Sequence, residues 1–170
     1  MFYDCTSLTS INFQKFDTSR LLIMEYVFYN CYSLKSLDLS SFDTSKVTDF
    51  HWMFYNCSSL VTLDLYNFNT SSCICTFHMF NNCTKLISLN LNSFDTSKVT
   101  YIYNMFIGCK SLISLNLNHF SVSSLEKYEN IFTDINPNII FCIESSNVIS
   151  SQITSNFKKN CSDIFLKTLN

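Results

Sequence analysis

Cysteine is the residue of this sequence with the widest chemical potential, because nine cysteines occur in 170 residues. Thiolates bind zinc and act as nucleophiles, and pairs of thiols form disulfides. Zinc sites use Cys-x-x-Cys pairs or Cys and His residues that converge on one point. Five of the cysteines instead recur every 26 residues, at Cys5, Cys31, Cys57, Cys83 and Cys109. This column predicts a row of small buried thiols; disulfides between neighbouring units and catalysis are the alternatives.

A second group of thiols is formed by Cys73 and Cys75, with His78 three residues after the latter. It has two chemical interpretations, a Cys-x-Cys metal pair and a hydrolase that uses Cys73 and His78. Cys73 lies in a column otherwise occupied by valine, so its thiol should face the core. The histidines His51, His78 and His119 lie in three different columns and form no Ser/His/Asp or Cys/His arrangement. We therefore expect no catalytic residue, no metal ligand and no cofactor.

An acidic column offers oxygen ligands. Asp17, Asp43 and Asp95 share it with Asn69 and Ser121. Stacked carboxylates could bind calcium. The same residue types also form turns in which the side chain accepts nearby backbone N–H groups. Replacement by Asn and Ser favours the turn.

The elements that position these residues follow from an internal repeat. Five 26-residue units succeed one another without insertion or deletion, and a partial sixth begins at Ile131. Each unit contains L-x-x-L-x-L, which places residues such as Leu37 and Leu39 on one face of a strand. One short strand per unit predicts a coil that adds one parallel strand per turn. The second half of a unit, Thr48–Phe54 for example, has apolar residues at i, i+3 and i+4, which predicts a short helical turn.

The predicted fold is a leucine-rich-repeat solenoid of the α/β type, with about five and a half coils over residues 1–143. A parallel sheet forms one wall and short helical turns form the other. Residues 144–170 are expected to be a C-terminal capping tail or a linker. Asn30, Asn56, Asn82 and Gly108 follow the turns and are expected to be left-handed caps. The strands should centre on 10–13, 36–39, 62–65, 88–91, 114–117 and 140–143.

The units resemble those of a known family. The segments Met53-Phe-Tyr-Asn-Cys-Ser-Ser-Leu-Val-Thr-Leu-Asp-Leu and Phe42-Asp-Thr-Ser-Lys-Val-Thr are similar to BspA-like leucine-rich repeats of microbial surface proteins. The resemblance covers roughly residues 1–132. It implies a horseshoe-type solenoid on a cell surface that is used in adhesion and protein–protein contact.

Residues that alternate with the inward leucines should form a polar, nearly uncharged outer face on the sheet. Solenoids use such extended faces to bind macromolecules, so we expect a protein or glycan ligand there; the alternative is a face that is merely solvated. The candidate binding face is Ser36, Asp38, Ser40, Thr62, Asp64, Tyr66, Asn90, Asn92, Asn116 and Asn118.

Cys142 and Cys161 lie outside the cysteine column. Cys142 falls in the outward column of Asp38 and Asp64, where packing gives no reason for a cysteine. The tail between the two cysteines is long enough to fold back over the last coil. We expect a Cys142–Cys161 disulfide that fixes the cap; two unpaired thiols are the alternative.

Composition narrows the function. The net charge of −2 and the single glycine exclude a basic nucleic-acid surface and a Gly-rich phosphate loop. No run of 18 apolar residues spans a membrane. The chain opens in mid-coil, which suggests a monomer or a fragment of a longer surface protein whose signal peptide lies upstream. We expect a non-catalytic cell-surface or extracellular adhesion module; the alternative is an intracellular leucine-rich-repeat scaffold. The sequons at Asn56, Asn69, Asn82 and Asn160 leave glycosylation open.

Overall fold

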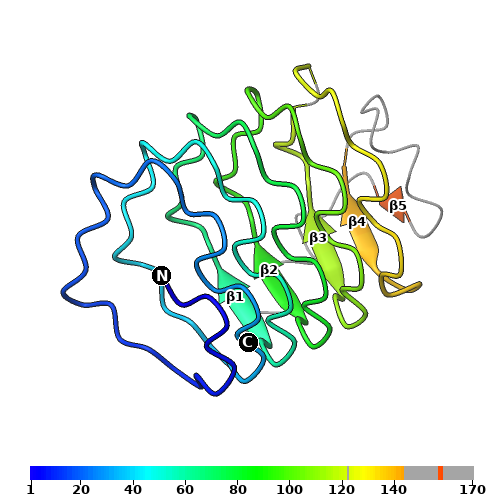
Figure 1. Ribbon diagram of the computed structural model, residues 1–170. Helices are drawn as coiled ribbons and strands as arrows, with labels where there is room; N and C mark the ends of the chain where they lie inside the picture. Colours follow the sequence, from blue (N-terminus) through cyan, green and yellow to red (C-terminus); the bar gives the residue numbers. More distant parts are fainter. Residues whose placement is uncertain (122, 144–156, 159–170) are drawn as a thin grey trace.

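The computed structural model describes residues 1–121, 123–143 and 157–158. Successive repeat units lie side by side and progress in chain order from the blue N-terminal units to β4 (Figure 1). Each unit from the third onward contributes one short strand. The strands are β1 (Thr62–Asp64), β2 (Ser88–Asn90), β3 (Ser114–Asn116), β4 (Ile140–Cys142) and β5 (Phe157–Lys158).

All strand pairs are parallel. β1 pairs with β2, and β3, β4 and β5 form a second sheet in that order. The register places Leu63 beside Leu89 and Leu115 beside Phe141, so paired residues are one repeat apart. The repeat period therefore sets the register. β5 departs from it, since Phe157 lies beside Phe141 after a shorter interval.

Two of the expected strands are not formed. Segments 10–13 and 36–39 contain no strand, whereas the four later segments do. The backbone bonds between units are long at this end, with Lys35 N–H 3.4 Å from the Thr9 carbonyl and Val61 N–H 3.3 Å from the Lys35 carbonyl. Ile11 is also only half-buried. The ladder of bonds that defines a strand is thus incomplete at the N-terminal end.

The opposite wall carries a second parallel alignment. Single bridges join Ile23 to Asp49, Asp49 to Cys75, Cys75 to Tyr101 and Tyr101 to Lys127. These residues are again one repeat apart. The units are therefore aligned at two places around each coil, which fixes the side chains of one unit against those of the next.

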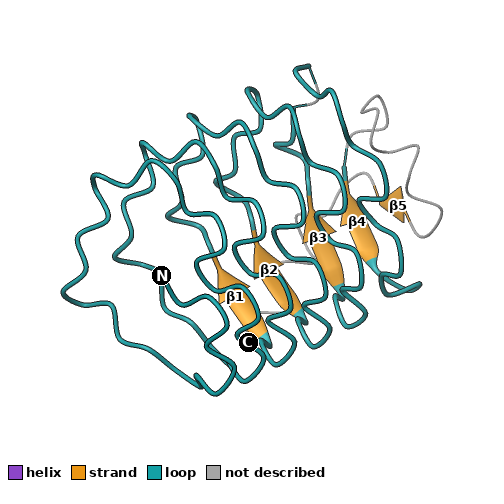
Figure 2. Cartoon of the chain, in the orientation of Figure 1, coloured by secondary structure: helices purple, strands orange, loops and turns teal. Residues whose placement is uncertain are grey.

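The helical turns expected at Thr48–Phe54 and its counterparts are wrong. The described residues contain no helix, and this wall is drawn entirely as loop (Figure 2). The N–H of Phe54 donates to the Met79 carbonyl at 2.9 Å, and the N–H of Trp52 donates to the Phe77 carbonyl at 3.2 Å. Trp52 also has a left-handed φ of 60°. Backbone donors that a helix would use within the unit are bonded to the next unit instead.

The residues expected to be left-handed do have positive φ, although they end a turn and not a helix. The φ angles are 58° at Asn30, 57° at Asn56, 59° at Asn82 and 74° at Gly108. Asparagine tolerates this conformation better than most residues. Its side chain also links units, since Asn56 Nδ2 donates to Asn30 Oδ1 at 2.9 Å.

We predict that Gly108→Ala destabilises the protein by about 1–2 kcal/mol, because alanine disfavours positive φ. A Cβ at Gly108 would also lie 2.4 Å from Asn82 Oδ1. Gly108→Asn should cost less, since the preceding units carry asparagine there and bond it to its neighbour. Urea titration of the two variants tests this; an alanine variant at least as stable as the asparagine variant would contradict it.

The core consists of residue columns that run through all units. The ring of Phe80 stacks in parallel on Phe54 and on Phe106, with centroids 5.6 Å apart in both pairs. The leucines of the strand, such as Leu63 and Leu89, are buried beneath it. The columns expected from the sequence to be inward are therefore buried in the middle units.

A column of threonines joins the units at a third place. The Thr70 hydroxyl donates to the Asp95 carbonyl at 3.0 Å and accepts the Asp95 N–H at 2.8 Å. Both groups belong to the next unit, so one buried side chain satisfies two backbone groups. Thr18, Thr44 and Thr96 donate in the same way to the carbonyls of Asp43, Asn69 and Ser121.

The expected tail over 144–170 lies outside the described residues except for β5, which adds a parallel strand to β4. Within the part of the chain that the structure describes, no helix has the length and apolar character needed to cross a membrane.

Candidate functional site

The residues of the predicted binding face lie on the outer side of consecutive strands. In β1 the burial alternates, with Thr62 and Asp64 exposed on either side of buried Leu63. Tyr66 is the most exposed aromatic side chain of this face, at 66%. Ser36, Asp38, Ser40, Asn92 and Asn118 are exposed, and Asn90 and Asn116 are half-buried.

Hydrogen bonds hold this face in one arrangement. Asn90 Nδ2 donates to Asp64 Oδ1 at 3.0 Å across β1 and β2, and Asn116 Nδ2 donates to Asn92 Oδ1 at 2.9 Å. Asp64 Oδ1 also accepts the N–H of Tyr66. Because the polar groups are already ordered, a ligand would lose less side-chain entropy on binding them.

The face is hollowed where the first two units meet. A pocket of about 280 Å³ lies there, and its polar lining is Asn12, Gln14, Asp38, Ser40 and Ser41. Hydroxyl, amide and carboxylate groups converge on it without a basic residue. Such a lining can bind polar, hydrogen-bonding ligands.

The acidic column forms turns. Asp17 Oδ1 accepts the backbone N–H of Ser19 at 3.0 Å and its hydroxyl at 2.6 Å. These bonds lower the pKa of Asp17. The same bond to the residue two positions on occurs at Asp43, Asn69 and Asp95. The turn interpretation is therefore the one that fits the side chains.

The regular cysteine column consists of free thiols that donate to backbone carbonyls of the preceding unit. Cys83 Sγ lies 3.1 Å from the Phe54 carbonyl, and Cys109 Sγ lies 3.1 Å from the Phe80 carbonyl. Burial raises the pKa of Cys109 to about 12. These thiols are packed donors, not nucleophiles.

Cys73 and His78 have separate surroundings. Cys73 is buried and its thiol lies 3.5 Å from the Cys75 carbonyl. Both ring nitrogens of His78 bond to amides, Nδ1 to Asn81 and Nε2 to Asn104. Desolvation lowers the pKa of His78. The contacts of these two residues do not support their use as a hydrolase pair.

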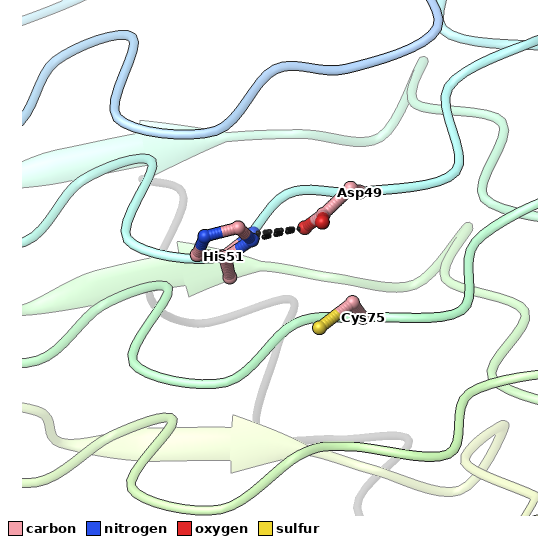
Figure 3. Close-up of side chains that lie close together, drawn as sticks. All are labelled: Asp49, His51 and Cys75. Atoms are coloured by element: carbon pink, nitrogen blue, oxygen red, sulfur yellow. Dashed lines mark hydrogen bonds and ion pairs between the residues drawn. The ribbon is translucent and has the colours of Figure 1, made fainter.

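Three other residues lie together as a set of metal-ligand types, Asp49, His51 and Cys75 (Figure 3). Asp49 and His51 come from one unit and Cys75 comes from the next. One ligand atom of each lies within 4.8 Å of the others. His51 Nδ1 is 2.5 Å from Asp49 Oδ1, and His51 Nε2 is 3.2 Å from Glu25 Oε2 in the preceding unit.

This cluster was missed because the ligand search compared residues within one column or one short segment. The signal that could have revealed it is the period itself: Cys75 follows Asp49 by one repeat of 26 residues, and His51 lies two residues beyond Asp49. Adding one repeat to each polar position of this wall finds the pair.

Cys142 is not exposed, as its outward column had suggested, but fully buried. It is disulfide-bonded. A disulfide brings a second cysteine against the sulfur, which allows a position of an outward column to be buried. Cys161, the expected partner, lies outside the described residues, so the Cys142–Cys161 pairing stays a prediction.

The chain matches the family model described as "Mycoplasma protein of unknown function, DUF285" in three overlapping stretches, residues 1–88, 37–141 and 61–163. Overlapping matches are typical of a family whose model itself spans several repeats. No curated protein and no solved structure matches the chain significantly.

Proposed function

The chain belongs to the DUF285 family, and from this premise we propose that it is a non-catalytic cell-surface interaction module that binds a protein or glycan partner through the polar face of its strands. The fold that goes with this proposal is a leucine-rich-repeat solenoid. The resemblance of the units to BspA-like repeats supports both the fold and the surface location.

The observation that carries the proposal is the ordered polar face over consecutive strands. Amide and carboxylate groups at Asp64, Asn90, Asn92 and Asn116 are held by bonds to one another. Groups of this kind bond well to sugar hydroxyls and to peptide backbone. Tyr66, which is 66% exposed, adds an aromatic surface on which a sugar ring or an apolar side chain can stack.

The pocket beside Asp38 and Ser40 gives the same face a concave end. The described part of the face carries no lysine or arginine among its candidate residues, which favours neutral polar ligands over polyanions. The proposed ligand is therefore a neutral glycan or a polar protein surface.

We predict that replacing Asp38, Asp64 and Tyr66 together with alanine lowers binding at least about tenfold, since side chains at the centre of an interface carry most of the affinity. The wild-type protein is first coupled to beads and exposed to a glycan array and to host cell-surface and matrix extracts. Retained glycans or proteins are then titrated against both forms.

The matched control replaces Asp43, Asp95 and Tyr32 with alanine. These are again two exposed aspartates that accept a backbone N–H two residues on and one exposed tyrosine, but they lie off the face. The control should bind as wild type does. Equal losses in the two triple variants, or no ligand retained by the wild type, would contradict the proposal.

An intracellular scaffold is the second candidate, and one observation favours it: seven cysteines are free, Cys5 among them only half-buried. Free thiols are typical of a reducing compartment. The bonded state of Cys142 favours the surface instead. Mass spectrometry of the natively isolated protein separates the two, because a surface protein keeps Cys142 oxidised.

A further inference from the structure

We propose that Asp49, His51 and Cys75 form a binding site for a zinc-type divalent transition-metal ion, oriented by Glu25. Nothing in the proposed ligand-binding function requires this site, because it lies on the wall of single bridges and not on the polar face. The proposal stands on the contacts of these four side chains.

The donor set selects the class of metal. A thiolate, an imidazole and a carboxylate together match Zn²⁺ and its neighbours, whereas calcium and magnesium take oxygen ligands. The three ligand atoms lie within 4.8 Å of one another. Bond lengths of about 2.0–2.3 Å place the ligand atoms of a tetrahedral zinc ion about 3–4 Å apart. Only small movements therefore separate the present arrangement from a coordinating one.

Glu25 supplies the second feature of a metal site. A histidine that binds a metal through one ring nitrogen usually donates the other N–H to a carboxylate or carbonyl. His51 has this arrangement, since Nδ1 faces Asp49 and Nε2 contacts Glu25 Oε2 at 3.2 Å. The ring of His51 is further fixed by stacking on Phe77, with centroids 4.5 Å apart. Its ligand nitrogen is thereby aimed at the cluster (Figure 3).

Cys75 is where a column changes its chemistry. The residues aligned with it by single bridges are Ile23, Asp49, Tyr101 and Lys127, none of which is a thiol. Its side chain is 9% exposed, which is enough to reach an ion at the edge of the wall. A thiolate beside the Asp49 carboxylate is disfavoured without a cation, and a metal ion supplies the missing positive charge.

On binding, the thiol proton of Cys75 and the proton shared by His51 and Asp49 leave to solvent, and no electron is transferred. The ion then joins one unit to the next through side chains. Three protein ligands leave the fourth tetrahedral position to water.

Cobalt(II) alone is the probe, since it replaces zinc and absorbs light. Titration of the reduced full-length protein should give a sulfur-to-cobalt charge-transfer band at a stoichiometry of one, which added Zn²⁺ abolishes. Cys75→Ser should remove the band. Cys73→Ser is the matched control and should keep it, because Cys73 is a buried thiol two residues away that faces the core.

Glu25→Gln tests the orienting carboxylate and should weaken cobalt binding about 10–100-fold, with the charge-transfer band kept at saturation. It does not remove a ligand, and Glu25 is partly exposed, so the variant should fold. No charge-transfer band in the wild type, or a band that persists in Cys75→Ser, would overturn the site. Unchanged affinity in Glu25→Gln would overturn the role of Glu25.

Discussion

Phe80→Ala is expected to lower the free energy of unfolding by about 3–5 kcal/mol, the range for large aromatic deletions in a packed core. The side chain of Phe80 is fully buried and stacks on Phe54 and Phe106 at 5.6 Å. Alanine leaves a cavity between two units whose neighbouring rings cannot close it, because each is fixed by its own backbone bonds. Urea titration followed by circular dichroism measures the change.

Tyr66→Ala is the matched aromatic control. Tyr66 is 66% exposed on the outer face, so its removal should change stability by no more than about 0.5 kcal/mol. Similar losses at Phe80 and Tyr66 would mean that the assignment of inner and outer columns is wrong.

The second large effect is expected at Thr70. Thr70→Val keeps the shape of the side chain but removes the hydroxyl that bonds both the carbonyl and the N–H of Asp95. Two backbone groups of the next unit lose their partner, at about 1–3 kcal/mol each. We expect a destabilisation of about 2–4 kcal/mol by the same urea titration.

Thr76→Val makes the same substitution at a site that is also buried, and its expected outcome has the opposite sign. The Thr76 hydroxyl has no hydrogen-bond partner among the residues that the structure describes. A buried polar group without a partner is unfavourable, so valine should leave stability unchanged or raise it by about 1 kcal/mol. A loss at Thr76 as large as that at Thr70 would contradict the threonine ladder.

The buried columns could be predicted from sequence because they depend only on the period. Phenylalanine and leucine recur at positions such as Phe54 and Leu63 in each unit, and an apolar column that repeats in register must be covered by its neighbours. The left-handed residues could be predicted for a related reason, since asparagine and glycine alternate at one position, Asn82 and Gly108.

The helical turns could not be predicted correctly, because apolar spacing reports which side chains face the core and not where the backbone donors bond. Phe50, Met53 and Phe54 are buried as a helix would bury them. Their segment instead bonds outward to the next unit, as Trp52 does to Phe77. Spacing of three and four residues is therefore consistent with stacked turns as well as with a helix.

The metal-type cluster and the burial of Cys142 escaped prediction for a different reason. Each depends on a contact between segments that the column analysis treated separately. Asp49 and Cys75 are one repeat apart but share no residue type, so the column shows no pattern. Cys142 lies in an outward column, yet it is disulfide-bonded and buried.

The alignment of each unit with the next is the claim on which the polar face and the metal-type cluster both depend. It is tested most directly by NMR scalar couplings across hydrogen bonds. The amide nitrogens of Phe54 and Phe80 should couple to the carbonyl carbons of Met79 and Met105, because these pairs are 2.9 and 3.0 Å apart. Coupling of Phe54 to the Phe50 carbonyl, as in a helix, with no coupling to Met79, would contradict the account.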